Sequence, residues 1–270
     1  MDKSKRNTDN SVKLLSVAVK SWFIVVVISH FIFALYILGL YGLSTIRHNW
    51  DRWNTNTPHG YEADDLLGTV IFGIHVLLAG IITIGGPLQL MPQIRNRWPR
   101  FHHINGRTYI LAAFMISIAG LYLSWVKGSV GGLIGSIFIS INAILIMISA
   151  YYTITHAIRH HITEHRKWAI RLFVCMSGVW LFRLLLMLWF FIFQRPYGFD
   201  PESFKGPALN FLYICSYILP IIIVQWYFYS KNHGRQHRLI FSSALLIITL
   251  GIVVGSIMAT IGMWLPSFDM

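Results

Sequence analysis

Seven long apolar runs dominate this sequence and limit the folds that it can adopt. They lie near residues 21–43, 66–92, 108–126, 131–157, 168–194, 208–230 and 239–265. Each run reaches the roughly 20 residues that an α-helix needs to cross about 30 Å of hydrocarbon. Because lipid offers no water to the backbone, a continuous apolar run must form a helix there. The sequence therefore predicts an all-α, polytopic membrane protein, a bundle of about seven transmembrane helices.

The composition fits a chain surrounded by lipid. Hydrophobic residues make up 55% of the 270 and charged residues only 12%, against roughly 25% charged in an ordinary soluble domain. The formal charge of +12 is that of many nucleic-acid binders, but here the basic residues lie between apolar runs rather than on one soluble face. We therefore expect membrane lipids as partners, with another membrane protein or a second copy of the chain as further candidates, and no nucleic acid.

The distribution of lysine and arginine predicts the orientation of the chain. Sixteen of the 22 flank the runs on one side, five lie on the other side, and Arg183 lies within a run. Because cytoplasmic loops carry the excess of lysine and arginine, the amino terminus is expected in the cytoplasm and the carboxyl terminus outside. Residues 1–20 are then a basic cytoplasmic segment, and residues 21–270 form a single transmembrane domain.

Two ionisable residues, His75 and Arg183, lie deep within the predicted spans. At 1.5 Å per residue both fall roughly 13 to 17 Å from the same face, so they share a level near the midplane. An ionisable group inside a membrane is costly and therefore suggests a function. Two interpretations stay open: a structural pair in which neutral His75 accepts from Arg183, or a site for an anionic ligand, a proton or a haem propionate.

Histidine is abundant, with 12 residues, most of them on the basic side. A b-type haem needs two imidazoles on different helices that face one slot, with basic residues near its propionates. His102 and His165, at the heads of the third and fifth runs, lie on the same side and are the candidate ligands of haem b. His30 and His75 are further candidates.

Two other histidines, His156 and His160, are four residues apart and would face one way on a helix. That spacing suits a metal ion, but no carboxylate or cysteine accompanies the pair at a recognised offset. Contact with lipid phosphates explains histidines among arginines equally well. No metal site is predicted.

The second run contains Gly85-Gly86-Pro87, which predicts that its helix kinks or breaks. Broken helices mark many transporter sites, whereas Gly-Pro segments also occur where helices pack closely, and packing is the favoured interpretation. Asn142 and Pro220 add a polar group in the fourth run and a second kink in the sixth.

A set of small motifs from Leu66 to Tyr229 resembles a family of mostly bacterial multi-span proteins known as a domain of unknown function. The residues that carry the resemblance are His75, Gly86, Gln89, Arg95, Pro99, His102, Gly106, Arg107, Tyr109, His165, Trp168, Arg171 and Arg183. The chain departs from the family pattern at His103, where a basic residue is typical, and at Gln225, where an acid is expected. The resemblance implies a membrane scaffold, in a bacterial cytoplasmic membrane, and no established activity.

The candidate site residues fall into two clusters. His75 and Arg183 form the deep cluster; His102, Arg107, His165 and Arg171 form an inner-surface cluster. Both suit electron transfer through haem, or an anionic lipid or quinone held between helices. No nucleophile accompanied by a base is visible, so the catalytic residues are unknown and an enzymatic role is left open. The leading hypothesis is a haem-binding or redox protein. The alternatives are a transporter of a small amphipathic or anionic molecule and an accessory subunit of a membrane complex.

Overall fold

Helices form almost all of the chain. The computed structural model describes residues 3–57 and 59–269, and within these ranges it contains no β-strand. The α-helices are α1 (Lys3–Ile37), α2 (Leu43–Ile46), α3 (Leu66–Leu90), α4 (Pro92–Arg97), α5 (Pro99–Tyr122), α6 (Gly132–Ile158), α7 (Ile162–Met176), α8 (Gly178–Phe193), α9 (Pro207–Tyr213), α10 (Leu219–Asn232), α11 (Arg235–Ala259) and α12 (Pro266–Asp269). The turns η1 (Leu38–Gly42), η3 (Leu123–Lys127), η4 (Ile214–Ile218) and η5 (Thr260–Trp264) are π-helical, and η2 (Trp50–Asn54) is a 3₁₀-helix.

These helices supply the predicted membrane spans. Among the described residues, six helical stretches are long and apolar enough to cross a membrane, and the pair α7 and α8, bent by 48° at Ser177, gives a seventh when it is counted as one span. The predicted all-α class with about seven spans is confirmed. The orientation of the ends relative to the cytoplasm stays a prediction.

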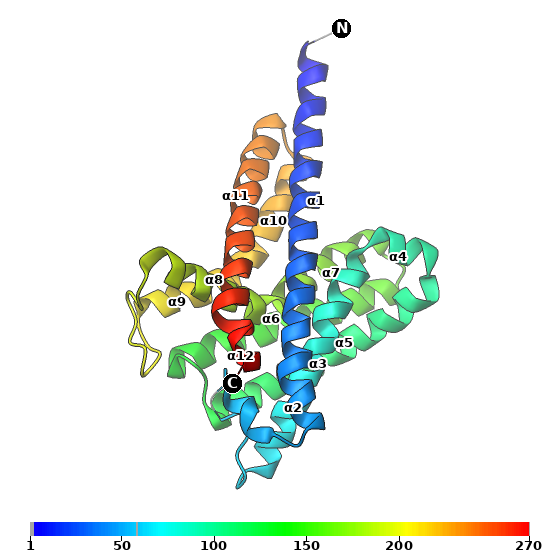
Figure 1. Cartoon of the computed structure of the whole chain (residues 1–270). Helices are drawn as coiled ribbons and strands as arrows, with labels where there is room; N and C mark the ends of the chain where they lie inside the picture. Colours follow the sequence, from blue (N-terminus) through cyan, green and yellow to red (C-terminus); the bar gives the residue numbers. More distant parts are fainter. Residues whose placement is uncertain (1–2, 58, 270) are drawn as a thin grey trace.

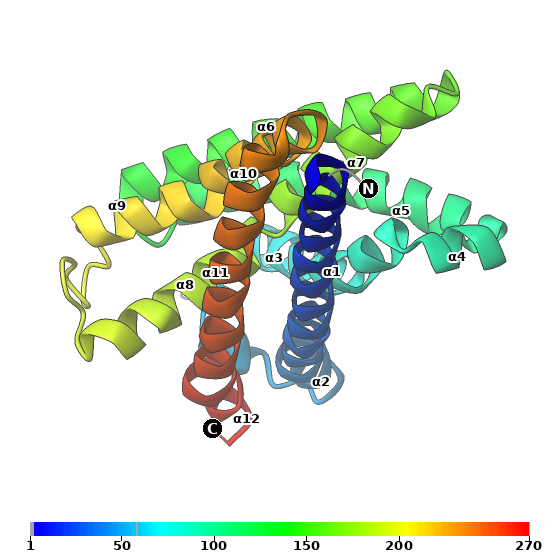
Figure 2. The same cartoon turned by 90° about the horizontal axis from the view of Figure 1, so that it is seen from above.

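Helices α1 and α11 lie side by side in both views (Figures 1 and 2). Figure 1 shows α4, α5 and α7 on one side of this pair and α9 on the other, with the two ends of the chain at opposite ends of the pair. Helix α1 runs without interruption from the basic segment into the first span, and Leu15 and Ala18 of that segment pack near Phe241 and Leu245 of α11. Residues 3–20 therefore belong to the same helix as the first span. The division into a basic segment and a single transmembrane domain stays a prediction.

Local signals in the sequence explain where several helices begin. The Asp65 carboxylate accepts a hydrogen bond of 2.9 Å from the backbone N–H of Gly68, which caps α3. Pro92, Pro99 and Pro207 are the first residues of α4, α5 and α9, where a missing N–H costs no helical hydrogen bond.

Of the two alternatives predicted at Gly85-Gly86-Pro87, the break is wrong, because α3 continues through these residues to Leu90; the kink stays a prediction. The two glycines instead let α3 approach its neighbours. Asn105 of α5 donates a 3.0 Å hydrogen bond to the carbonyl of Gly85, and a Cβ on Gly86 would lie 3.1 Å from Tyr109 and Phe173. Close packing, the favoured interpretation of this motif, accounts for it.

Candidate functional site

A cavity of about 870 Å³ lies inside the bundle. Its wall includes residues of α1, α3, α5, α6 and α8, and it extends to the three loops 47–65, 128–131 and 194–206. We call this side of the cavity its loop end. The volume falls in the range of roughly 300 to 1,000 Å³ that is typical of small-molecule sites.

Each of the four π-helical turns supplies a side chain to the cavity wall. The residues are Tyr41 from η1, Lys127 from η3, Tyr217 from η4 and Met263 from η5. A π-helical turn carries one residue more than the α-helix and shifts the direction of the side chains that follow; such turns are frequent at functional sites. The spans are therefore irregular where they border the cavity.

Arg183 of α8 supplies a guanidinium group to the cavity wall. Its guanidinium lies over the ring of Phe33, 5.7 Å from the ring centre, and one nitrogen approaches the carbonyl of Val179 at 3.5 Å. Among the described residues no carboxylate forms an ion pair with it. A guanidinium has five N–H donors, so most of its hydrogen-bonding capacity is not used by the protein.

His75 of α3 lines the same cavity as Arg183. The structure shows no hydrogen bond between the two side chains. The imidazole ring lies near the backbone of Ile116 and Gly120 on α5, and its Nδ1 atom is buried without a hydrogen-bond partner among the described residues. The sequence therefore located both residues on one site, but the direct pair that it offered as one interpretation is not formed.

His30 of α1 also borders the cavity and is 3% exposed. Both of its ring nitrogens are occupied: Nδ1 lies 2.9 Å from the carbonyl of Val26, and Nε2 lies 3.1 Å from the hydroxyl of Ser177. The ring packs against Trp180 and Phe173. His30 thus joins α1 to the bend between α7 and α8, and a metal or haem iron would have to displace one of these contacts.

The fold brings to the cavity several polar residues that carry little signal in the sequence. Asn142 of α6 is 7% exposed, and its Oδ1 atom is buried without a partner among the described residues. Tyr217 packs on Gly178 beside it, and the hydroxyl of Tyr36 accepts a 2.9 Å hydrogen bond from Asn56. Only the position of Asn142 in an apolar run marked it in advance, and nothing in the sequence placed it next to α8.

An ion-pair cluster stands at the loop end of the cavity. Lys127, whose side chain is 6% exposed, lies 3.1 Å from a carboxylate oxygen of Glu62 and 3.2 Å from one of Asp65. The hydrogen bond from His59 and then the ion pair with Lys127 lower the pKa of Glu62, while the N–H of Gly68 and then Lys127 lower the pKa of Asp65. Lys127 is therefore neutralised by two carboxylates, unlike Arg183.

The two leading candidate haem ligands, His102 and His165, are not part of the wall of this cavity. His102 lies near the start of α5 and His165 near the start of α7, and His165 influences His102 electrostatically. The Nδ1–H of His165 donates to the carbonyl of Thr153 at 3.0 Å, which leaves Nε2 free in the neutral ring. The Nδ1 atom of His102 is buried without a partner among the described residues, and the backbone carbonyl of His102 accepts a bond from Gln89.

The two arginines of the inner-surface cluster do not join these histidines. Arg171 stacks on Trp168 and Phe228, at 4.4 and 5.2 Å from the ring centres, and donates a 2.8 Å hydrogen bond to Gln225. Arg107 is exposed on α5. Gln225, which stands where the family pattern suggests an acid, therefore binds Arg171 through its side-chain amide.

His156 and His160 do not share a helix face as expected, because α6 ends at Ile158 and His160 lies in the turn that follows, with a φ of 56°. His156 packs on Tyr152, and its ring lies 5.8 Å from that of His161. Within the described residues no group of three His, Cys, Asp or Glu side chains is placed to hold a metal ion.

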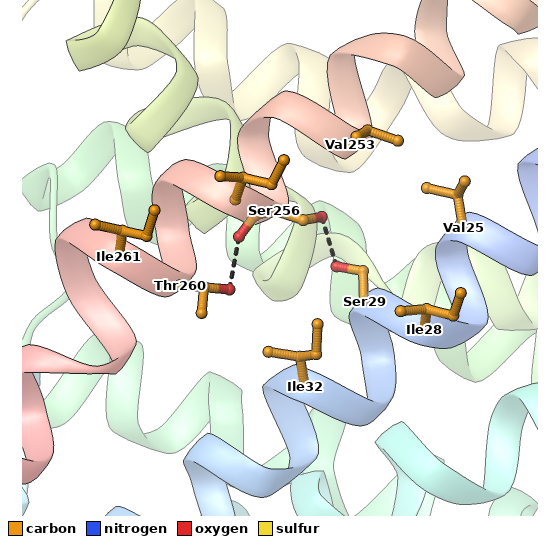
Figure 3. A pocket seen from close by; sticks show the side chains of 9 residues that line it. Val25, Ile28, Ser29, Ile32, Val253, Ser256, Thr260 and Ile261 are labelled. Carbon is orange, nitrogen blue, oxygen red and sulfur yellow. Dashed lines mark hydrogen bonds between the residues drawn. The ribbon is translucent and has the colours of Figure 1, made fainter.

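A second hollow, of about 470 Å³, lies between α1 and α11 (Figure 3). Apolar side chains such as Ile28, Ile32 and Ile261 surround it, and the hydroxyl groups of Ser29 and Ser256 join the two helices across it at 2.7 Å. Ile28 and Ile261 are also exposed on the outside of the bundle. This hollow is an apolar groove on the outer surface and offers no charged group.

The fold and the cavity define an integral membrane protein with a chamber inside its helical bundle whose mostly apolar wall carries a few polar groups. Residues 72–210, just over half of the chain, match the family described as "Predicted membrane protein (DUF2306)", and the chain belongs to this uncharacterised family. The match includes His75, His102, His165 and Arg183 and confirms the resemblance drawn from the motifs. No curated protein and no solved structure is significantly similar to the chain.

Proposed function

We propose that the chain binds a small anionic amphipathic molecule in the interior cavity, with Arg183 as its charge partner. The observation that carries the proposal is a guanidinium that borders a chamber inside the membrane and has no carboxylate partner among the described residues. A cation without an anion is unfavourable in a medium of low dielectric constant, so a bound anion would stabilise this arrangement. Binding of this kind is a step shared by transport of such a molecule and by its delivery to a membrane partner.

The shape and lining of the cavity suit such a ligand. Apolar side chains, among them Phe33, Ile37, Val76 and Ile82, cover much of the wall and would surround an alkyl tail. The polar groups near Arg183 and His75 would face the headgroup. A mostly apolar wall with a few polar groups is the usual composition of a small-molecule site.

Radiolabelled laurate tests this proposal on the purified chain in nanodiscs. We expect saturable binding that unlabelled laurate displaces and that dodecanol, the uncharged molecule of the same chain length, does not. Arg183→Gln is expected to lower the affinity at least tenfold, because it removes a hydrogen bond between two charged groups. Arg159→Gln, at an exposed arginine in the turn after α6, is the matched control and is expected to bind as the wild type does. Equal displacement by dodecanol, or full binding by Arg183→Gln, would contradict the proposal.

A second candidate function is electron transfer through haem b held by His102 and His165. The observation that favours it is the orientation of His165, whose Nδ1–H is fixed by the Thr153 carbonyl while Nε2 stays free, together with its electrostatic influence on His102 of another helix. Ligand histidines are usually held by such a hydrogen bond from the second nitrogen. We expect a haem protein to show a Soret band that shifts on reduction with dithionite and disappears in His102→Ala and in His165→Ala. A colourless preparation from haem-replete cells would remove this candidate.

The bacterial cytoplasmic membrane remains the proposed location, with the amino terminus inside. The excess of lysine and arginine next to the turns 91–98, 159–161 and 233–234 supports this orientation. Reporter fusions at the two ends would contradict it if both ends were active in the same compartment.

A further inference from the structure

The fifth span is interrupted where it borders the cavity. Helix α7 ends at Met176, α8 begins at Gly178, and Ser177 lies in a turn between them. Ser177, Val179 and Trp180 all line the cavity. The first turn of the 16-residue helix α8 is therefore placed inside the bundle, next to Arg183.

No side chain caps the start of α8. The hydroxyl of Ser177, which holds the N-cap position, donates to the carbonyl of Phe173 at 2.8 Å and does not reach the first-turn amides. The first N–H groups of a helix have no partner within the helix, and together they act as about half a positive charge. In transporters, interrupted helices often direct such ends toward anionic groups of the substrate.

Asn142 provides independent evidence at the same place. Its side-chain nitrogen lies 3.3 Å from the position that a Cβ on Gly178 would occupy. Its Oδ1 is buried and has no partner within the described part of the chain. A buried amide without a partner is costly, and because a flip exchanges its two ends, the group can present its N–H₂ to a ligand in the cavity.

The local charge selects the class of headgroup. Arg183 contributes one positive charge to the cavity wall, and the start of α8 adds a partial one. Lys127 is already neutralised by Glu62 and Asp65, and Glu202, which also borders the cavity, lies in the loop 194–206. A monoanion would be balanced there, whereas a phosphate monoester would leave an uncompensated charge in a medium of low dielectric constant.

We infer that the start of α8, Asn142 and Arg183 form the headgroup subsite for an amphipathic carboxylate. This inference rests on the proposed function and makes it specific. The carboxylate accepts from the guanidinium of Arg183, from the first-turn amides of α8 and from the Asn142 side chain. Its alkyl tail lies along the apolar part of the cavity.

The Asn142→Leu variant tests the subsite separately from Arg183. Leucine has a similar size and carries no polar group, so the ligand-free variant is expected to melt at or above the wild-type temperature. Its affinity for laurate is expected to fall about tenfold, the effect of one hydrogen bond to a charged group. Ser149→Ala removes a buried hydroxyl on the same helix, away from the cavity, and is expected to keep the wild-type affinity.

The competing results are distinguishable. Wild-type affinity in Asn142→Leu, together with lost binding in Arg183→Gln, would overturn the subsite and leave the proposed function in place. No laurate binding by the wild type would overturn the proposed function itself. Stronger displacement of labelled laurate by dodecyl phosphate than by laurate would overturn the carboxylate class.

If Asn142→Leu does not fold, Asn142→Asp gives the same test. It keeps the shape of the side chain and places a negative charge at the start of α8, where it would compete with the ligand. We expect it to abolish laurate binding. Retained binding at wild-type affinity would overturn the subsite.

Discussion

Trp264→Ala is expected to lower the free energy of unfolding in detergent by about 3 to 5 kcal/mol, the cost of replacing a large buried aromatic residue with alanine. Trp264 in η5 is 1% exposed, and its ring lies 5.3 Å from that of Phe33 and 5.9 Å from that of Tyr36. Within a membrane, helices are held together mainly by such close packing rather than by transfer from water. Phe33 also lies under the guanidinium of Arg183. The variant therefore removes the residue that packs against Phe33 at the cavity wall.

Two further variants test whether lost packing causes the expected loss of stability in Trp264→Ala. Trp98→Ala removes an exposed tryptophan at the turn before α5 and is expected to change the free energy of unfolding by less than about 0.5 kcal/mol. Trp264→Phe keeps an aromatic ring and removes an indole N–H that is buried without a partner among the described residues. It is therefore expected to lower the free energy of unfolding by less than half as much as Trp264→Ala does. The free energies are measured by unfolding with sodium dodecyl sulfate. A loss in Trp98→Ala as large as that in Trp264→Ala would contradict this account.

The spans could be predicted from the sequence because each one depends on its own composition. A run of apolar residues has to form a helix in lipid whatever surrounds it, and the predicted ranges agree closely with α3 and α6. The family, too, was recognised from motifs within single segments.

The interruption in the fifth span was missed because its local signal is weak. Ser177 and Gly178 form a Ser-Gly pair inside a long apolar run, whereas Gly85-Gly86-Pro87 carries a stronger signal and yet lies in a continuous helix. A proline or glycine lowers the stability of a helix, but neighbouring helices can restore it. Contacts between helices therefore decide which of the two segments interrupts its helix. Examples are the contact of Asn105 with Gly85 and that of Tyr217 with Gly178, which the sequence of a single segment does not reveal.

The candidate site could be predicted only in part, because its geometry also depends on contacts between helices. Depth along a helix placed His75 and Arg183 at one level, and the structure puts them on one cavity. Depth does not determine which way a side chain points around the helix axis. The approach of Asn142 to the start of α8, and the separation of Arg171 from His165, depend on how the helices are rotated and packed.

Gly255→Ala and Gly251→Ala are expected to change stability in opposite directions, although both lie on α11 four residues apart. A Cβ on Gly255 would lie 2.9 Å from the carbonyl oxygen of Leu184 on α8, whereas a Cβ on Gly251 would meet only a leucine methyl group at 4.0 Å. Alanine favours a helix over glycine by about 0.5 to 1 kcal/mol, so Gly251→Ala is expected to stabilise the chain by up to that amount. At Gly255 the contact is with backbone, which no side-chain rotation relieves, and overpacking of this kind costs about 1 to 3 kcal/mol.

The difference between the two variants, about 1 to 3 kcal/mol because the helix-propensity gain is common to both, measures how closely α8 and α11 must approach. Small residues at a helix contact allow such an approach in membranes, and α8 carries both Arg183 and the proposed headgroup subsite. Separating the helices at Gly255 should therefore weaken laurate binding as well as stability, while Gly251→Ala should leave binding unchanged. Equal unfolding free energies for the two variants would show that the contact between Gly255 and Leu184 does not hold α8 in place.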